Sequence, residues 1–385
     1  MVNKMYEQYQ QHVKDLRCTN KYRQLHGRCQ VNQDKCINFS TNDYLNLSTN
    51  HSVIEAVVVA AQEYGVGATG SRLLSGDRDC FHTIESSIAK SKGMEEAIIF
   101  SSGFQANVSA LSALLSADVL GAPPLVFFDK LNHSSLYQGV FLSGAELVRY
   151  RHNDMVHLEV LLKQHKNDHR HKFIIAETLF GMDGDVLPIH DVAELAKQHH
   201  AILYLDEAHA TGILGPLGYG LSTAIDLDGL HCIVMGTFSK ALGCSGSYIA
   251  CSKTIKEYLI NKATGFVYST APSPAIMCGA LKAWRMLPEM VNERSQLQHL
   301  SSILRSKLSK SNFDIGASVT HIVPIIVGEE RVAIDMMNNL MNNNLIVSCV
   351  RPPTVPPGTS RLRIALCSHH QEKDLDLLVS TLERI

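Results

Sequence analysis

A single lysine, Lys240, stands among small hydroxyl side chains just beyond an apolar run. The run 231–235 reads H-C-I-V-M, which is typical of a buried strand, and residues 237–243 read T-F-S-K-A-L-G. Lysine is costly to bury unless its charge is paired or its pKa falls. A lysine that releases its proton readily can form a Schiff base with a carbonyl group such as that of pyridoxal phosphate. The hydroxyls of Thr237 and Ser239 could hold a phosphate. On this stretch alone, a solvated lysine in a loop is an equally good interpretation.

A second apolar run, 201–205, ends in an acid. Residues 206–212 read D-E-A-H-A-T-G, so Asp206 closes the strand and His209 follows three residues later. A carboxylate here suits a protonated pyridine nitrogen, because it keeps the ring cationic and the cationic ring withdraws electrons from a carbanion. In this order along the chain, the acid–histidine and hydroxyl–lysine elements resemble the fold-type I pyridoxal phosphate enzymes, and among them the α-oxoamine synthases. Neither element alone carries the resemblance.

Three further segments resemble cofactor-binding segments of this family. Residues 102–104 read S-G-F at a strand-to-helix turn, where backbone N–H groups favour a phosphate, although many such turns are plain connections. His133 lies in D-x-x-N-H-x-S, and the resemblance implies that its ring stacks on the cofactor; taken alone, it is a polar residue at a helix N-terminus. Glu177 opens E-T-L-F-G-M-D-G-D, which departs from the family at Gly181, where many members carry serine. The resemblance puts these residues at the cofactor: Gly103, Phe104, His133, Glu177, Asp206, His209, Thr237, Ser239, Lys240 and Thr270, the last reaching the partner subunit's phosphate.

The resemblance also implies contacts with an amino-acid substrate. Residues 38–45 read N-F-S-T-N-D-Y-L and enter the active site in the family, so Asn42 is a candidate contact. An Asx-turn is the other interpretation of Asn42. Residues 351–363 read R-P-P-T-V-P-P-G-T-S-R-L-R, and Arg363 can clamp a carboxylate with two hydrogen bonds. The alternative is that Arg361 and Arg363 lie on an exposed alternating strand face.

The resemblance also implies a substrate contact at Thr354, in the proline-rich segment, and a contact with the acyl carboxylate near the N-terminus. The first 35 residues match the family poorly, so it stays open whether Arg17 or Arg23 meets the acyl carboxylate.

The segment 351–363 is most similar to the branch of the family that condenses L-alanine with a pimeloyl thioester, of CoA or of an acyl carrier protein, in biotin biosynthesis. The resemblance implies that Lys240 binds the cofactor and then removes the Cα proton, while Asp206 keeps the ring nitrogen charged. It also implies that His133 stacks on the ring and that His209 bonds its phenolic oxygen.

Two other functions stay open. A sister α-oxoamine synthase, either a 2-amino-3-ketobutyrate ligase or an autoinducer-type synthase, would keep the cofactor residues and change the substrates. A dinucleotide-dependent oxidoreductase would rest on Gly65–Gly70, which matches G-x-G-x-x-G but follows a helical pattern where that fingerprint needs a strand.

Composition narrows the class of protein. The 385 residues are 45% hydrophobic and 19% charged, which is typical of a globular chain with two domains. The net charge of -2 argues against nucleic acid as the main partner. The ten cysteines include no C-x-x-C pair, and the histidines near residue 169 form no closed ligand set, so no metal is expected. We expect a cytoplasmic protein without membrane contact, because no signal peptide or long apolar run is present. The family's sites lie at a subunit interface, which implies a homodimer.

The elements that must position these residues alternate between strand and helix. This alternation from about residue 97 to 251 predicts a mostly parallel sheet covered on both faces, with the motif loops at the strands' carboxyl ends. The resemblance implies the α/β fold of type I pyridoxal phosphate transferases, with a smaller α/β C-terminal domain. We expect an N-terminal helix and segment over 1–45, with the helix reaching about residue 30. A large domain is expected over 46–280 and a small βαβ-like domain over 281–385, entered by a helical stretch over 274–310.

Overall fold

The computed structural model describes residues 2–25 and 36–385, and the chain divides into two compact units. The larger unit contains residues 42–180 and 186–294. The smaller unit contains residues 1–41, 181–185 and 295–385, so the N-terminal segment belongs with the C-terminal part of the chain. The division expected at residues 45 and 280 stays a prediction beside these two units.

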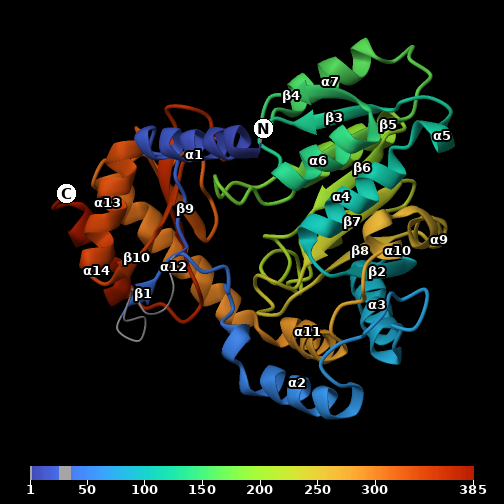
Figure 1. Cartoon of the computed structure of the whole chain (residues 1–385), viewed down its shortest axis with the longest axis horizontal. Helices are drawn as coiled ribbons and strands as arrows, with labels where there is room; N and C mark the ends of the chain where they lie inside the picture. The colour runs from blue at the N-terminus through green and yellow to red at the C-terminus, as the bar shows by residue number, and fades with distance from the viewer. Residues whose placement is uncertain (1, 26–35) are drawn as a thin grey trace. The chain divides into compact units, whose positions relative to one another are not determined.

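A seven-stranded sheet forms the centre of the larger unit (Figure 1). Its strands lie in the order β2-β8-β7-β6-β5-β3-β4, and all neighbours are parallel except β8, which runs antiparallel to β2 and β7. The predicted mostly parallel sheet is therefore confirmed. Its strands are β2 Glu96–Phe100, β3 Leu125–Asp129, β4 Glu146–Tyr150, β5 Lys172–Glu177, β6 Ile202–Asp206, β7 Cys232–Thr237 and β8 Ser247–Cys251.

Some helices of the larger unit begin or end at capping residues that the sequence supplies. The Ser102 hydroxyl accepts a hydrogen bond from Gln105 N at the start of α4, and the Asp154 side chain accepts one from His157 N at the start of α7. Helix α3 ends at Gly93, whose left-handed conformation (φ 64°) suits glycine. The helices are α2 His51–Tyr64, α3 Asp79–Lys92, α4 Gly103–Leu114, α5 Ala117–Leu120, α6 Ser134–Ser143, α7 Met155–Gln164, α8 Ile189–Gln198, α9 Lys253–Lys262, α10 Thr264–Val267 and α11 Pro274–Met286, with short 3-10 turns η3 Leu47–Thr49, η4 Leu221–Ala224 and η5 Leu287–Glu289.

Side chains of the central sheet alternate between two buried faces. Tyr204, Met235 and Ile249 share an apolar cluster with residues of α4 and α6, which cross one face of the sheet in Figure 1. Their chain neighbours Val234 and Tyr248 are also fully buried and must point to the other face, because successive strand residues alternate. Consecutive residues at the end of a strand therefore reach different helix layers.

The smaller unit contains two small sheets. One has the strand order β11-β12-β9, with β12 antiparallel to both neighbours, and the other pairs β1 with β10 in parallel. Strand β9, helix α13 and strand β11 follow one another as the βαβ-like pattern predicts, and β12 then inserts between the two strands. The elements of this unit are β1 Ile37–Asn38, β9 Ile322–Gly328, β10 Leu345–Ile346, β11 Ser348–Val350, β12 Ser360–Ala365, α1 Val2–Cys18, α13 Glu330–Asn342 and α14 Glu372–Leu382; α12 Val291–Lys310 leads into it.

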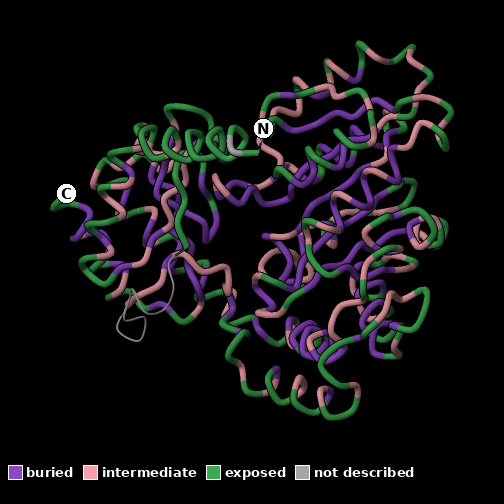
Figure 2. The backbone as a smooth tube through the Cα atoms, in the orientation of Figure 1, coloured by how far each residue is buried: buried purple, intermediate pink, exposed green. Residues whose placement is uncertain are grey.

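Two predicted helices need correction. The N-terminal helix expected to about residue 30 ends at Cys18, and residues 26–35 lie outside the described residues. The helical stretch expected over 274–310 is interrupted between α11 and α12, where η5 contains Pro288, because proline lacks the N–H that a continuing helix needs. Figure 2 shows the strands of the central sheet buried, apart from the edge strand β4, and α1 exposed along most of its length.

Within residues 2–25 and 36–385, no three His, Cys, Asp or Glu side chains gather as metal ligands would. None of the helices described there combines the length and the apolar character that crossing a membrane requires. The cysteines of the described ranges are free thiols.

Candidate active site

The carboxyl ends of β6 and β7 carry the two residues around which the site is built. The strands are parallel neighbours, and Asp206 pairs in register with Met235, two residues before Thr237. Lys240 follows Thr237 by three residues at the same edge of the sheet. Desolvation lowers the pKa of His133. The Asp206 carboxylate acts to raise that pKa, and the Lys240 ammonium acts to lower it further. Both charges therefore act on one imidazole ring, and the structure brings the three residues together.

Asn107, on α4, fixes the Asp206 carboxylate. Its Nδ2 donates to Asp206 Oδ2 over 2.8 Å and to Ser135 Oγ over 2.9 Å. Its Oδ1 accepts from Tyr204 OH over 2.8 Å. The other carboxylate oxygen, Asp206 Oδ1, accepts the backbone N–H of Ala208 over 2.8 Å. Both polar atoms of the Asn107 side chain are hydrogen-bonded. Both oxygens of the Asp206 carboxylate accept a hydrogen bond, so the orientation of the carboxylate is fixed.

His133 is joined to the same network through Ser135. Its Nδ1 accepts the backbone N–H of Ser135 over 3.2 Å and lies 2.7 Å from Ser135 Oγ. Because Asn107 already donates to that hydroxyl, the hydroxyl proton points to Nδ1, and a neutral His133 ring carries its own proton at Nε2. His133 is the N-cap of α6, so the helix-end interpretation is confirmed, and the residue is exposed. Stacking on a cofactor stays a prediction.

Glu177 closes β5 beside Asp206, with which it pairs in register. Its backbone N–H donates to Asn132 Oδ1 over 3.1 Å, which ties the loop before α6 to the strand end. Burial raises the pKa of Glu177 well above its usual value, Asp206 raises it further, and Lys240 opposes both. The raised pKa favours the protonated form of Glu177.

His209 is held by a tyrosine that the sequence analysis did not single out. His209 Nδ1 lies 2.7 Å from Tyr44 OH, and Tyr44 OH donates to Asn42 Oδ1 over 3.0 Å. Since the single hydroxyl proton goes to Asn42, the bond to His209 requires a proton on Nδ1. The Asn42 side-chain oxygen is thus engaged by Tyr44, and its contact with substrate stays a prediction.

The two hydroxyls after β7 lie beside the N-terminus of α4. Thr237 Oγ1 donates to Gly246 O over 2.9 Å and lies 2.8 Å from Ser239 Oγ. Gly103 is the first residue of α4, and a Cβ added there would lie 3.8 Å from Thr237 Cβ, an ordinary contact. A side chain at position 103 would therefore fit the packing of the protein, so packing does not explain the glycine. The space next to Gly103 lies at the N-terminus of α4, where an anion is favoured. Phe104 follows, with 46% of its surface exposed.

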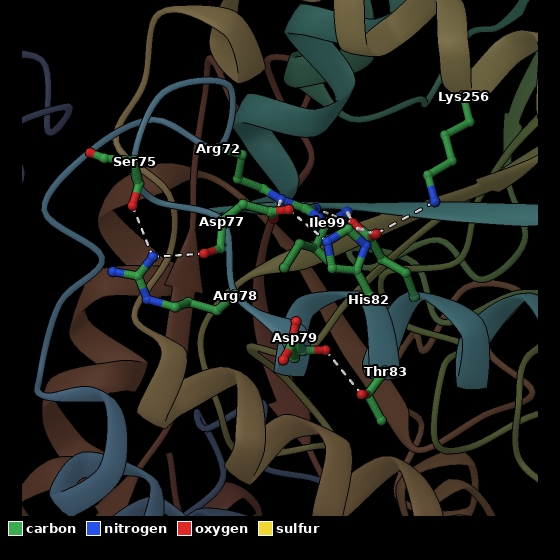
Figure 3. A network of polar contacts seen from close by, with 10 residues as sticks. Arg72, Ser75, Asp77, Arg78, Asp79, His82, Thr83, Ile99 and Lys256 are labelled. Carbon is green, nitrogen blue, oxygen red and sulfur yellow. Dashed lines mark hydrogen bonds and ion pairs between the residues drawn. The ribbon is translucent and has the colours of Figure 1, made fainter.

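An ion-pair network holds the loop over residues 70–78 (Figure 3). Arg72 Nε lies 2.7 Å from Asp77 Oδ1, and Arg72 also pairs with the buried Glu85. Glu85 Oε1 accepts the backbone N–H of Ile99 over 3.0 Å, so the loop is tied to β2. The loop therefore has a fixed place next to the strand that leads into α4.

The glycine motif at 65–70 serves this loop rather than a dinucleotide. It follows helix α2, and a Cβ at Gly70 would collide with Ser75 Oγ, so Gly70 is needed for the loop to close on itself. The oxidoreductase interpretation is wrong. Gly70 O accepts the N–H of Ala271 over 2.9 Å, which anchors the segment carrying the exposed Thr270.

Arg363 is buried in the smaller unit. All six residues of β12 are buried, and Arg363 Nε donates to Gly181 O over 2.5 Å. Arg361, on the same face of β12, pairs with Asp183 over 2.6 Å. The alternative of an exposed alternating strand face is wrong, because residues 181–185 cover that face.

Thr354 and the N-terminal arginines line one cavity of about 790 Å³ in the smaller unit. Arg23 Nη2 donates to Thr354 Oγ1 over 2.9 Å, whereas Arg17 lies over the Tyr22 ring, 4.6 Å from its centroid. Arg351 adds a third guanidinium, and the apolar side of α13 forms another wall. The cavity pairs apolar surface with positive charge, and the geometry links Arg23 rather than Arg17 to Thr354.

The residues of the larger unit fit pyridoxal phosphate. An amine at Lys240, a fixed carboxylate at Asp206 and a hydroxyl pair beside a helix N-terminus gather at one sheet edge, where ligands bind in such folds. The supporting side chains of Asn107 and Tyr44 were missed by sequence reasoning. Asn107 did carry a signal, since it is a polar residue on the apolar side of a helix.

Comparison with known proteins identifies the family of the chain. The family model of aminotransferase class I and II matches residues 34–382. A putative 8-amino-7-oxononanoate synthase of Paramagnetospirillum magneticum is 44% identical over 356 residues, 92% of this chain and 90% of that protein. An 8-amino-7-oxononanoate synthase of Gluconacetobacter diazotrophicus is 40% identical over 349 residues, 90% of this chain and 87% of that protein.

Two solved structures extend the comparison to the fold. Serine palmitoyltransferase from S. paucimobilis, with bound PLP, gives a TM-score of 0.85 at 27% identity, covering 91% of this chain and 87% of the other. The 8-amino-7-oxononanoate synthase from Francisella tularensis gives 0.77 at 29% identity, covering 91% and 98%.

These likenesses span nearly the whole chain. The fold is the type I pyridoxal phosphate transferase fold, with a mostly parallel central sheet in a larger unit and a smaller α/β unit. The cofactor is pyridoxal phosphate, and the chain is an acyltransferase that depends on it. The chain therefore belongs to the aminotransferase class I and II family, in the group of the 8-amino-7-oxononanoate synthases.

Proposed function

We propose that this chain condenses L-alanine with a pimeloyl thioester to give 8-amino-7-oxononanoate, carbon dioxide and a free thiol, a step of biotin biosynthesis. The thioester is that of CoA or of an acyl carrier protein. The observation that carries the proposal is the meeting of Lys240, Asp206 and His133 at one sheet edge, where both charges act on the histidine ring. The choice of substrates rests on the relatives of 40–44% identity that bear this name.

Bound pyridoxal phosphate supplies an aldehyde that captures an amino group and a pyridinium ring that withdraws electrons from the neighbouring carbon. Asp206 would accept the hydrogen bond of the ring N–H and keep that proton in place. His133 would cover one ring face and exclude water, while His209 would bond the phenolic oxygen. The raised pKa of Glu177 favours its neutral form, which would add no second charge beside Asp206.

Backbone N–H groups and uncharged hydroxyl side chains hold the phosphate. The backbone N–H groups of Gly103 and Phe104 at the start of α4 donate to it, and the hydroxyls of Thr237 and Ser239 complete the site. Thr270 is proposed to reach the phosphate of the partner subunit, so the chain would work as a homodimer. Scattering from the holoenzyme in solution tests this assembly.

Lys240 Nζ would hold the cofactor, and its amine, once free, would remove the Cα proton of L-alanine. Arg363 binds the alanine carboxylate. A bond forms between Cα and the thioester carbonyl carbon while the C–S bond breaks, and the thiol leaves with its electron pair and a proton. The bond from Cα to the carboxylate then breaks, carbon dioxide leaves, and a proton returns to Cα.

The acyl end of the reaction is assigned to the cavity of the smaller unit. Its apolar wall suits a methylene chain, and its guanidinium groups suit a terminal carboxylate. Arg23, already bonded to Thr354, is the first candidate for that carboxylate, and Arg17 is the second.

A sister α-oxoamine synthase is the second candidate function. It is favoured by the serine palmitoyltransferase structure, whose TM-score of 0.85 exceeds the 0.77 of the 8-amino-7-oxononanoate synthase structure. Release of free thiol should be measured with pimeloyl-, acetyl- and palmitoyl-CoA, each combined with alanine, glycine and serine, and pimeloyl carrier protein should be included. Our proposal expects alanine with a pimeloyl donor to give the highest kcat/KM. A clear maximum for acetyl-CoA with glycine, or for palmitoyl-CoA with serine, would contradict it.

The cytoplasm is the proposed location, on the ground that the cofactor and thioester substrates are metabolites of that compartment. Fractionation of cells that express the intact chain tests the location.

A further inference from the structure

A buried ion pair lies directly behind the turn that carries the cofactor-binding acid. Asp206 and Glu207 are consecutive, and their side chains reach different helix layers. Asp206 bonds to Asn107 of α4, whereas Glu207 pairs with Lys92 at the end of α3. The side chains of Lys92 and Glu207 are both fully buried. The mechanism above gives neither of them a role.

The pair is enclosed by contacts that leave little freedom. Glu207 Oε2 pairs with Lys92 Nζ, and Glu207 Oε1 accepts the N–H of Ser222 over 2.6 Å. Burial lowers the pKa of Lys92, but the Glu207 carboxylate outweighs this and the pKa is raised, so Lys92 keeps its charge. A Cβ at Gly220 would collide with Glu207 Oε2 and lie 2.7 Å from Lys92 Nζ, so only glycine leaves room for the pair.

Both ends of the turn over residues 207–211 lie next to Lys92. The backbone oxygen of Glu207 accepts the N–H groups of Ala210 and Thr211 over 3.0 and 2.9 Å. Thr211 Oγ1 lies 3.0 Å from Tyr248 OH, and Lys92 Nζ lies 5.7 Å from the centroid of the Tyr248 ring. Glu207 and Thr211 are thus both fastened next to Lys92, and His209 lies between them.

We propose that Lys92 is a positioning residue for the cofactor site, because its ion pair with Glu207 fixes the turn from which Asp206 and His209 project. The inference rests on the roles proposed above for those two residues. Without the ammonium, Glu207 would be an unpaired buried charge, which must take up a proton or draw in water. Either change moves the backbone of residues 206–209, and the carboxylate then no longer meets the ring N–H of pyridoxal phosphate in line.

Lys92→Met removes the charge and keeps a long apolar side chain. We expect the Kd of pyridoxal phosphate, measured by absorbance titration of the resolved enzyme, to rise at least about tenfold, which corresponds to about 1.4 kcal/mol. The pH midpoint of the absorbance of the bound cofactor should shift as well, because Asp206 sets the protonation of the ring. Leu158→Ala, in the buried side of α7, is the control: it should lower the melting temperature and leave both cofactor readouts within about twofold.

The double variant Lys92→Met/Glu207→Gln tests whether charge pairing is the cause. The introduced glutamine keeps an acceptor for the N–H of Ser222 and leaves no charge unpaired, so cofactor affinity should return to within about threefold of the unmodified chain. The inference is overturned if folded Lys92→Met binds the cofactor as the unmodified chain does, if the double variant stays as weak as Lys92→Met, or if Leu158→Ala weakens the cofactor equally. Asp206→Asn tests the proposed cofactor role of Asp206 separately from the positioning role of Lys92. If Asp206→Asn leaves cofactor affinity and absorbance unchanged, the proposed role of Asp206 fails. If Asp206→Asn has a strong effect and Lys92→Met has none, only the positioning role of Lys92 is refuted.

Discussion

Replacing Asn107 by alanine should loosen the cofactor site and destabilise the larger unit at once. The change removes the Nδ2 donor of Asp206 and of Ser135, and it removes the acceptor of the buried Tyr204 hydroxyl. Of the two hydrogen bonds described above, Asp206 then keeps the one from the Ala208 N–H, so its carboxylate can rotate about the Cβ–Cγ bond. Binding of pyridoxal phosphate and unfolding should therefore both change.

The magnitudes follow from the bonds that are lost. A hydrogen bond to a charged acceptor contributes about 1.5–3 kcal/mol, and a buried hydroxyl left without a partner costs about 1–3 kcal/mol. The free energy of unfolding of Asn107→Ala should therefore fall by about 2.5–6 kcal/mol in denaturant titrations of the cofactor-free protein. If half of the bond to Asp206 serves cofactor binding, the Kd of pyridoxal phosphate should rise about fourfold to twelvefold.

Tyr204→Phe is the matched control for this prediction. It removes the hydroxyl bonded to Asn107 Oδ1 and leaves the bond from Asn107 to Asp206 intact. It should cost about 1 kcal/mol of unfolding free energy and change cofactor affinity by less than about twofold. Equal cofactor affinities for Asn107→Ala and Tyr204→Phe would refute the reasoning, because the carboxylate would then not depend on Asn107 for its orientation.

Three further predictions concern the proposed chemistry and the stability of the smaller unit. Lys240→Ala should abolish turnover while the protein still binds pyridoxal phosphate, now released by dialysis; normal activity would exclude the assigned role. Arg363→Lys should raise the KM for alanine at least about tenfold in steady-state assays, because a lysine cannot bind a carboxylate with two parallel bonds; an unchanged KM would remove Arg363 from the substrate site. Burial and the Arg363 charge lower the pKa of His321 to about 3, below the value of about 6.5 in an unfolded chain, so the unfolded state binds more protons between these pH values. Unfolding free energy should accordingly fall by about 2 kcal/mol from pH 7 to pH 5, and His321→Asn should remove that part of the slope in denaturant titrations at both pH values.

The sheet and the strand-end residues were predictable because their signals are local. Apolar runs such as 125–129 mark buried strands, and the residues that leave a parallel strand's carboxyl end must meet at one edge. That rule alone brings Asp206 and Lys240 together once their strands are recognised as neighbours. The order of the strands, with antiparallel β8 between β2 and β7, depends on pairing between distant segments and has no such local signal.

The supporting residues could not be predicted for the same reason. Asn107 and Asp206 are 99 positions apart, and Lys92 and Glu207 are 115 apart. A buried lysine in particular reads as a solvated helix end until its partner is known. The alternative of an exposed strand face for Arg361 and Arg363 was wrong because the segment that covers β12 comes from residues 181–185, far back in the chain.

That same segment explains why the departure at Gly181 is compatible with the family's chemistry. The contact that Gly181 makes with Arg363 uses its backbone oxygen, which any residue would present, so the guanidinium does not depend on a side chain at position 181. What a serine would add is one hydroxyl, and His209, held by Tyr44, is already proposed to bond the phenolic oxygen. On the proposed roles, glycine at position 181 would remove one hydrogen bond to the ring and leave the proposed carboxylate contact of Arg363 intact, a change that favours altered cofactor electronics over loss of substrate binding.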